Sequence, residues 1–144
     1  MFSDVIVMPR KAVPSFKPDV PWALIQVATN ENTWPAYSTE NCVGSYQIAF
    51  PDADIKLEHI EGAMFNRRKA NAILDFIELV GDKIDLLAVH CEMGVSRSPA
   101  IAGALARHYL GDDFKFFNAP YTPNMVVYRY MMNAIEARYL VDKK

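Results

Sequence analysis

The sequence has little of several features that mark specialised proteins. Its 144 residues include two cysteines, Cys42 and Cys91, which is too few for a small secreted scaffold held by disulfides. No apolar run reaches the roughly 18 residues that a membrane-spanning helix needs. The first residues place their acid before their bases, unlike a signal peptide. The sequence therefore predicts a protein of the reducing cytoplasm that does not enter a membrane.

An excess of charge of either sign is also missing. The 15 basic and 17 acidic side chains give a formal net charge of −2, so no specific nucleic-acid binding is expected. The densest basic spot, Arg67-Arg68-Lys69, is typical of a solvated helix face, with a rim that attracts anionic substrates as the alternative. Two cysteines and three scattered histidines offer no zinc-ligand spacing. No metal or other cofactor is expected.

What the chain has is the composition of an ordinary folded protein. Hydrophobic residues make up 51% and charged residues 22% of the sequence, which argues against disorder. A chain of 144 residues is long enough to bury a substantial core as one unit. We therefore expect residues 1–144 to form a single domain.

Hydrophobic patterning predicts the order of the elements. Short β-branched or apolar runs predict strands over residues 4–8, 22–28, 45–50 and 84–90. Apolar residues at 3- and 4-residue spacing predict helices over 65–80, 99–111 and 124–141. Gly111 would end the second of these helices, and Asn124 would cap the third. The proline-rich segment 9–21 and the polar segment 29–44 are expected to be loops. This order predicts an α/β fold with a mostly parallel sheet of four to five strands flanked by helices.

One turn concentrates the candidate chemistry. The segment HCEMGVSRS, residues 90–98, lies between an apolar strand and a helix, where backbone N–H groups and the helix dipole favour an anion and a thiolate at Cys91. Gly94 permits close backbone approach. Arg97 offers a planar fork for two oxygens of a tetrahedral oxyanion, and Ser98 offers a hydroxyl to the sulfur. The sequence thus predicts a thiol site that attacks phosphate.

The same segment resembles the phosphate loop of the cysteine-dependent protein tyrosine phosphatases. His90 and Cys91, five further residues, then Arg97 and Ser98 match that family's pattern, and Gly94 with the Ser-Arg-Ser ending is similar to its dual-specificity branch. Four longer stretches look like small bacterial and phage phosphatases of dual-specificity type: PWALIQVATNENTWPAY, YQIAFPDADI, AILDFI and YTPNMVVYRYMMNAI. Taken together, the likeness covers most of the chain from about residue 22.

The resemblance implies a metal-independent phosphomonoester hydrolase that acts through a phosphocysteine. Cys91 would be the nucleophile, Arg97 would hold the phosphoryl oxygens, and Ser98 would stabilise the thiolate when it leaves. His90 would order the loop rather than transfer a proton. The phosphate-binding residues would be Glu92, Met93, Gly94, Val95, Ser96 and Arg97. The substrate would be a phosphorylated protein or another phosphomonoester, and phosphate- or vanadate-type oxyanions would bind in the same place.

A carboxylic acid must also protonate the leaving oxygen, and two aspartates are candidates. The family carries this acid on a separate loop that follows a strand upstream of the cysteine. Asp52, in Phe-Pro-Asp, resembles the Trp-Pro-Asp of larger relatives. Asp54 has the better spacing and precedes an isoleucine, as in small relatives. We favour Asp54, with Asp52 as the alternative.

Other functions stay open at this point. A rhodanese- or arsenate-reductase-like thiol enzyme also uses a cysteine at an anion-binding loop, although the late position of Cys91 and the Arg-Ser ending argue against it. A catalytically weak pseudophosphatase that only binds phosphate is the non-enzyme alternative. Cys42 lies in polar turn sequence without an arginine partner, so a structural role is expected, and a disulfide with Cys91 is the redox alternative.

Overall fold

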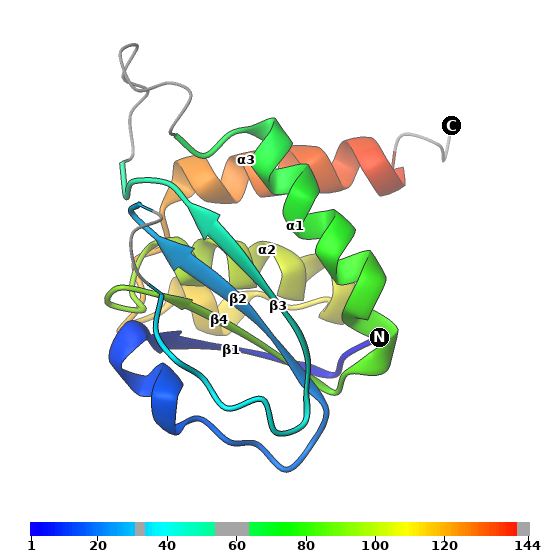
Figure 1. Cartoon of the computed structure of the whole chain (residues 1–144). Helices are drawn as coiled ribbons and strands as arrows, with labels where there is room; N and C mark the ends of the chain where they lie inside the picture. Colours follow the sequence, from blue (N-terminus) through cyan, green and yellow to red (C-terminus); the bar gives the residue numbers. More distant parts are fainter. Residues whose placement is uncertain (31–33, 54–63, 141–144) are drawn as a thin grey trace.

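The computed structural model describes residues 1–30, 34–53 and 64–140, which form a parallel sheet covered by helices (Figure 1). The strands are β1 (Asp4–Pro9), β2 (Trp22–Ala28), β3 (Cys42–Ala49) and β4 (Leu86–Cys91). They lie in the order β1-β4-β2-β3, and each neighbouring pair is parallel. The predicted α/β fold with a mostly parallel sheet is confirmed.

Three helices lie on one side of this sheet (Figure 1). They are α1 (Arg67–Val80), α2 (Arg97–Leu110) and α3 (Met125–Ile135). The helix α2 packs against β1 and β4, α1 packs against β3, and α3 contacts both other helices. Asn124 caps α3 by accepting hydrogen bonds from the backbone N–H groups of Val126 and Val127. Gly111 ends α2 in the left-handed conformation at φ 82°. The start of α3 and the end of α2 therefore follow the sequence-based prediction.

The sheet buries both of its faces, which explains why six of the seven residues of β2 are apolar. All seven residues of this strand are buried. Ile25 and Val27 belong to the main core on the helix side. Trp22 and Leu24 belong to a smaller core with Val13 of the short 3-10 helix η1 (Arg10–Ser15). A strand covered on both faces is mostly apolar rather than alternating, and the polar exception, Gln26, makes a hydrogen bond with His90.

The observed elements differ from the prediction at three places. The helix η1 lies inside the segment 9–21, which was expected to be a loop. The edge strand β3 begins at Cys42 rather than at residue 45, because its first residues pair with β2 through the backbone; Cys42 is therefore in a strand and not in a turn. The helix α3 ends at Ile135 and is followed by a π-helix, η5 (Glu136–Leu140). Two further 3-10 turns are η3 (Gly81–Lys83) and η4 (Phe114–Phe117).

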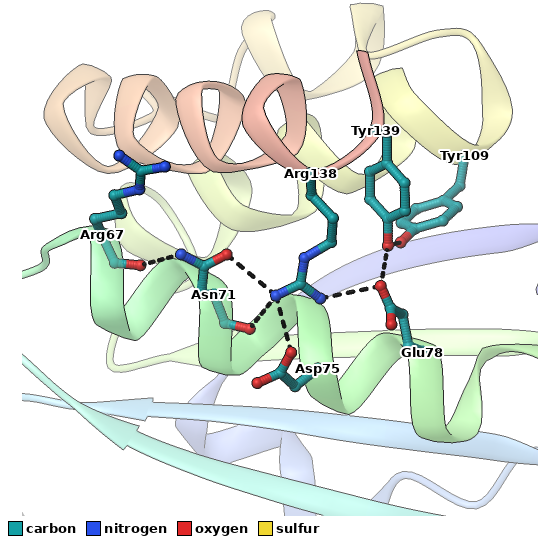
Figure 2. Close-up of polar contacts among 7 residues, drawn as sticks. All are labelled: Arg67, Asn71, Asp75, Glu78, Tyr109, Arg138 and Tyr139. Carbon is teal, nitrogen blue, oxygen red and sulfur yellow. Dashed lines mark hydrogen bonds and ion pairs between the residues drawn. The ribbon is translucent and has the colours of Figure 1, made fainter. Parts of the chain in front are cut away.

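A polar cluster fastens η5 to α1 (Figure 2). The guanidinium of Arg138 donates to Glu78 Oε1 at 3.0 Å and to Asp75 Oδ1 at 2.8 Å. It also donates to Asn71 Oδ1 at 3.1 Å. The hydroxyl of Tyr139 donates to Glu78 Oε1 at 2.7 Å. The hydrogen bonds from Tyr139 and Arg138, in that order, lower the pKa of the Glu78 carboxyl. One cation thus joins three acceptors along a single face of α1.

Replacing Arg138 is expected to loosen this end of the molecule. The change Arg138→Ala should lower the free energy of unfolding by about 1 kcal/mol, because a half-exposed ion-pair network is worth little more than that. The change Arg138→Lys keeps the charge but not the planar fork, so its loss should be intermediate. Urea unfolding measures the free energy of unfolding of wild type and of both variants at low and at high salt. The difference between each variant and wild type should be smaller at high salt. A loss that salt does not reduce would contradict an ion-pair contribution.

Candidate active site

The candidate site lies where the carboxyl ends of the parallel strands meet, as ligand sites in such sheets do. The strand β4 ends at Cys91, residues 92–96 form a turn, and α2 begins at Arg97. At the same edge, Thr29 follows β2 and Phe50 follows β3. We call residues 92–96 the Cys91 loop. The structure therefore has the strand–turn–helix arrangement that the sequence predicts here.

Close contact with the end of β1 shapes the Cys91 loop. Gly94 has a φ of +70°, and a Cβ at this position would lie 2.8 Å from Pro9 N and 2.9 Å from the carbonyl carbon of Met8. The backbone N–H of Arg10 donates to Glu92 O at 3.1 Å. A side chain at position 94 would be both strained and in collision with backbone. Glycine is needed here for the loop to close.

Cys91 and Ser98 form the inner part of the site. The Cys91 side chain is 2% exposed, and its Sγ lies 3.0 Å from the Oγ of the fully buried Ser98. Ser96 is the N-cap of α2, but its hydroxyl makes no capping hydrogen bond. It donates instead to Asp52 Oδ1 at 2.9 Å. Because no side chain caps α2, the positive end of the helix dipole stays open to an anion in the loop.

Arg97 supplies a buried cation beside the thiol. Arg97 is 5% exposed. Its Nη1 donates to Phe50 O at 2.9 Å and to Thr29 Oγ1 at 3.1 Å. The buried Nε has no hydrogen-bond partner among the described residues. A guanidinium that is held at one end and has a free N–H at the other is suited to bind oxygens of a tetrahedral anion.

These groups line a pocket of about 450 Å³. Its walls are formed by Asp52, Cys91, Glu92, Met93, Val95, Ser96, Arg97 and Thr122. Gly94 lies behind the loop against β1, and Ser98 supports Cys91 from within the protein. The structure thus brings Asp52 to the thiol site, although it is 39 positions from Cys91 in the sequence. Asp54, the aspartate favoured from the sequence, lies outside the described residues.

Asp52 has a second partner, which sequence reasoning missed. The side chain of Asn124 donates from Nδ2 to Asp52 Oδ1 at 3.0 Å and to Ala53 O at 2.9 Å. The sequence suggested only a helix cap at Asn124, and it singled out neither Thr29 nor Thr122. The sequence shows Pro123 followed by Asn124, which is enough to predict a helix cap. It gives no sign of the contact between Asn124 and Asp52, which lie 72 positions apart.

The side chain of His90 lies on the opposite face of the sheet from that of Cys91. The residue is fully buried, and its Nε2 lies 3.2 Å from Oε1 of Gln26, its neighbour in the β2–β4 register. Burial, followed by the positive charge of Arg10, lowers the pKa of His90 to about 4, against a smaller opposite effect from the Cys91 backbone. The imidazole is therefore neutral at pH 7, and its role in ordering the loop stays a prediction.

Cys42 and Cys91 are both free thiols at opposite ends of the sheet. Cys42 and Leu86 both pair with Trp22 at the start of β2, and Cys91 lies at the far end of β4. This separation is about 16 Å along the strands, whereas a disulfide needs Cα atoms within about 7 Å. The redox alternative of a Cys42–Cys91 disulfide is therefore wrong for this fold. Burial also raises the pKa of the Cys42 thiol.

None of the helices in residues 1–30, 34–53 and 64–140 combines the length and the apolar character needed to cross a bilayer. Those same residues contain no group of three or more His, Cys, Asp or Glu side chains that could hold a metal ion.

Comparison with known proteins yields matches of structure. No protein-family model matches the sequence, and no curated protein matches it. Human tyrosine phosphatase-like serine/threonine/tyrosine-interacting protein matches with a TM-score of 0.64 over 94% of this chain and 93% of its own, at 15% identity. Human DUSP28 matches with a TM-score of 0.65 over 93% and 94%, at 14% identity. A mouse protein described as a dual specificity phosphatase, complexed with zinc tungstate, has a TM-score of 0.58 over 86% and 77%, at 14% identity.

The chain has the phosphatase fold. Its helices and parallel sheet match those of these neighbours over most of both chains, which confirms the predicted fold; membership of the superfamily stays a prediction. At 14–15% identity the likeness concerns fold and not activity. The narrower resemblance to small bacterial and phage phosphatases stays a prediction.

Gly94 offers a test of the loop geometry. The change Gly94→Ala is expected to weaken vanadate binding about tenfold or more, because the added Cβ costs 1–2 kcal/mol in backbone conformation alone and also meets backbone. Isothermal titration measures the affinity. Gly111→Ala is the matched control, since Gly111 has a similar φ of +82° but open space around the added atom. Unchanged vanadate affinity in Gly94→Ala would contradict a role of the loop in anion binding.

Proposed function

We propose that the protein is a metal-independent, cysteine-dependent phosphomonoester hydrolase. The observation that supports this most directly is the convergence of Cys91, Ser98 and Arg97 at the end of β4, with the carboxyl group of Asp52 on the wall of the same pocket. A thiol nucleophile, an anion-binding loop with a guanidinium, and a carboxylic acid are the groups that such a hydrolysis requires.

In the first step, the thiolate of Cys91 attacks phosphorus in line with the leaving group. The S–P bond forms while the P–O bond to the leaving group breaks. The N–H groups of the Cys91 loop and the guanidinium of Arg97 stabilise the charge on the equatorial oxygens. We assign the acid to Asp52, because its carboxyl group lines the pocket; Asp54 is the alternative. The protonated carboxyl gives its proton to the leaving oxygen, so the alcohol departs neutral.

In the second step, water attacks the phosphocysteine. The carboxylate of the acid takes a proton from this water while the S–P bond breaks. The electron pair returns to Sγ of Cys91, and the hydroxyl of Ser98, 3.0 Å away, donates to the thiolate. Phosphate leaves, and both the thiolate and the protonated acid are restored. Water is the only co-reactant in this cycle.

The proposed substrate is a phosphorylated protein or another phosphomonoester. Phosphate- or vanadate-type oxyanions are proposed to bind at the Cys91 loop; the mouse neighbour is complexed with zinc tungstate, and tungstate is also a tetrahedral oxyanion. We place the activity in the cytoplasm, because the two free cysteines suit a reducing compartment.

A phosphate-binding module without turnover is the second candidate. One structural neighbour is named a phosphatase-like interacting protein. A protein with this fold can therefore be named for binding rather than for catalysis. The binding module predicts that phosphate and vanadate bind to the protein while no phosphomonoester is turned over. The hydrolase predicts both binding and turnover.

The nucleophile is tested by replacing each cysteine in turn. The wild-type protein should hydrolyse para-nitrophenyl phosphate in the presence of a chelator and be inhibited by vanadate. Cys91→Ser should lower kcat by about 1,000-fold or more, since the serine hydroxyl is a far weaker nucleophile than a thiolate. Cys42→Ser is the matched control and should retain wild-type turnover. Full activity in Cys91→Ser would show that this thiol is not the nucleophile.

The acid is tested by comparing two neighbouring aspartates. Asp52→Ala is expected to lower turnover by about 100-fold or more, because the leaving oxygen then departs without a proton. Asp54→Ala should have a much smaller effect if Asp52 is the acid. The reverse result would assign the acid to Asp54. If neither variant loses turnover, the segment that follows β3 does not carry the acid.

A further inference from the structure

The side chain of Asn124 uses both ends of its amide. Its Oδ1 accepts hydrogen bonds from Val126 N at 3.0 Å and Val127 N at 3.2 Å, as a helix cap does. Its Nδ2 donates in the other direction, to Asp52 Oδ1 at 3.0 Å and to Ala53 O at 2.9 Å. Asn124 is 6% exposed, so its own amide is buried, whereas Asp52, which accepts one of these hydrogen bonds, is an exposed residue.

Backbone contacts connect the same residue to the Cys91 loop. The N–H of Asn124 donates to Ser96 O at 3.0 Å, and Ser96 Oγ donates to Asp52 Oδ1 at 2.9 Å. Asp52, Ser96 and Asn124 therefore form a closed triangle. Its corners belong to the segment after β3, the Cys91 loop and the start of α3. A further hydrogen bond, from Thr122 N to Val95 O at 2.9 Å, holds the segment before α3 against the same loop.

The triangle orients one carboxyl group. Within the described part of the chain, the hydrogen bonds from Ser96 and Asn124 both end on Oδ1 of Asp52. The second oxygen, Oδ2, is then the one left to carry a proton. Asp52 is one of the residues that line the pocket containing Cys91. Proton transfer requires the acid to be within hydrogen-bond reach of the leaving oxygen, so the orientation of this group decides whether it can act.

Helix capping alone does not require an asparagine at position 124. Ser, Thr and Asp cap helices about as well, but only asparagine adds two N–H donors to the capping oxygen. Asn66, the N-cap of α1, is a useful comparison. It accepts a hydrogen bond from Lys69 N at 2.9 Å, and it is not among the described residues that line the pocket.

We infer that Asn124 is a positioning residue, the cap of α3 that holds the carboxyl group of Asp52 toward the leaving group. The inference rests on the proposed hydrolase function and on Asp52 as its acid. A displacement of about 1 Å at a reacting group can cost about 100-fold in rate. The loss is largest for esters with strongly basic leaving oxygens, because these depart slowly without a proton.

The experiment compares two aryl phosphates that differ in their leaving group. Asn124→Asp keeps a capping oxygen and removes both N–H donors, and Asn124→Ser keeps a capping oxygen without adding charge. The value of kcat/KM for phenyl phosphate should fall by about 10- to 100-fold in both variants. The value for para-nitrophenyl phosphate, whose leaving group needs a proton less, should fall much less. The ratio of the two values is therefore the readout, since kcat/KM covers the steps up to the phosphocysteine.

Two controls separate positioning from helix capping. Asn66→Asp makes the same change at the cap of α1 and should leave the ratio at its wild-type value. Thermal unfolding of each variant reports any loss of capping independently of the ratio. Asn124→Asp should also shift the ratio no further in an Asp52→Ala background, because coupled residues give non-additive effects.

The outcomes distinguish this inference from the proposed function. An unchanged ratio in both Asn124 variants, or a further shift in the Asp52→Ala background, overturns the positioning role while the hydrolase stands. Wild-type protein without Cys91-dependent turnover of either ester overturns the proposed function, and the inference with it.

Discussion

The burial of one cation, the guanidinium of Arg97, is the constraint on which the candidate site depends. A cation that is only 5% exposed is costly unless its N–H groups are paired. Two acceptors, Thr29 Oγ1 and Phe50 O, come from the ends of β2 and β3, so this side chain ties both strand ends to the start of α2. Its Nε has no acceptor within the described chain. An oxyanion beside Cys91 would complete the pairing, so the same interactions that hold the loops together also prepare them for an anion.

Features set by short stretches of sequence could be predicted. The largely apolar strand β2, the stop at Gly111 and the cap at Asn124 each depend on a few adjacent residues. The loop from Cys91 to Ser98 was recognisable for the same reason, since strand, turn and helix start are contiguous. The early start of β3 was not predictable, because it depends on backbone pairing with β2 and its first residues have no apolar pattern.

Which aspartate is the acid stays a prediction, but the contacts of Asp52 could not be predicted from the sequence, for a related reason. A spacing argument treats the chain as a line, and it favoured Asp54 over Asp52. The contacts that bring Asp52 to the pocket come from Ser96 and Asn124, which lie 44 and 72 positions away. The role of Thr29 is hidden in the same way, because a threonine in a polar loop has no local signal for a partner 68 positions away.

The two halves of the candidate site are held by different kinds of interaction. The Cys91 loop is fixed by backbone, through the sheet, the start of α2 and the close contact of Gly94 with β1. The carboxyl group of Asp52 is held by side-chain hydrogen bonds from Ser96 and Asn124. Under the proposed assignment of Asp52 as the acid, substitutions of the Ser96 and Asn124 side chains would remove acid assistance while the backbone of the Cys91 loop stays in place. A hydrolase and a phosphate-binding protein are then separated by a few side chains within one architecture, so fold similarity alone does not distinguish them. The dependence of the hydrolysis rate on the leaving group can distinguish them, because this dependence reports the action of the acid and not anion binding by the loop.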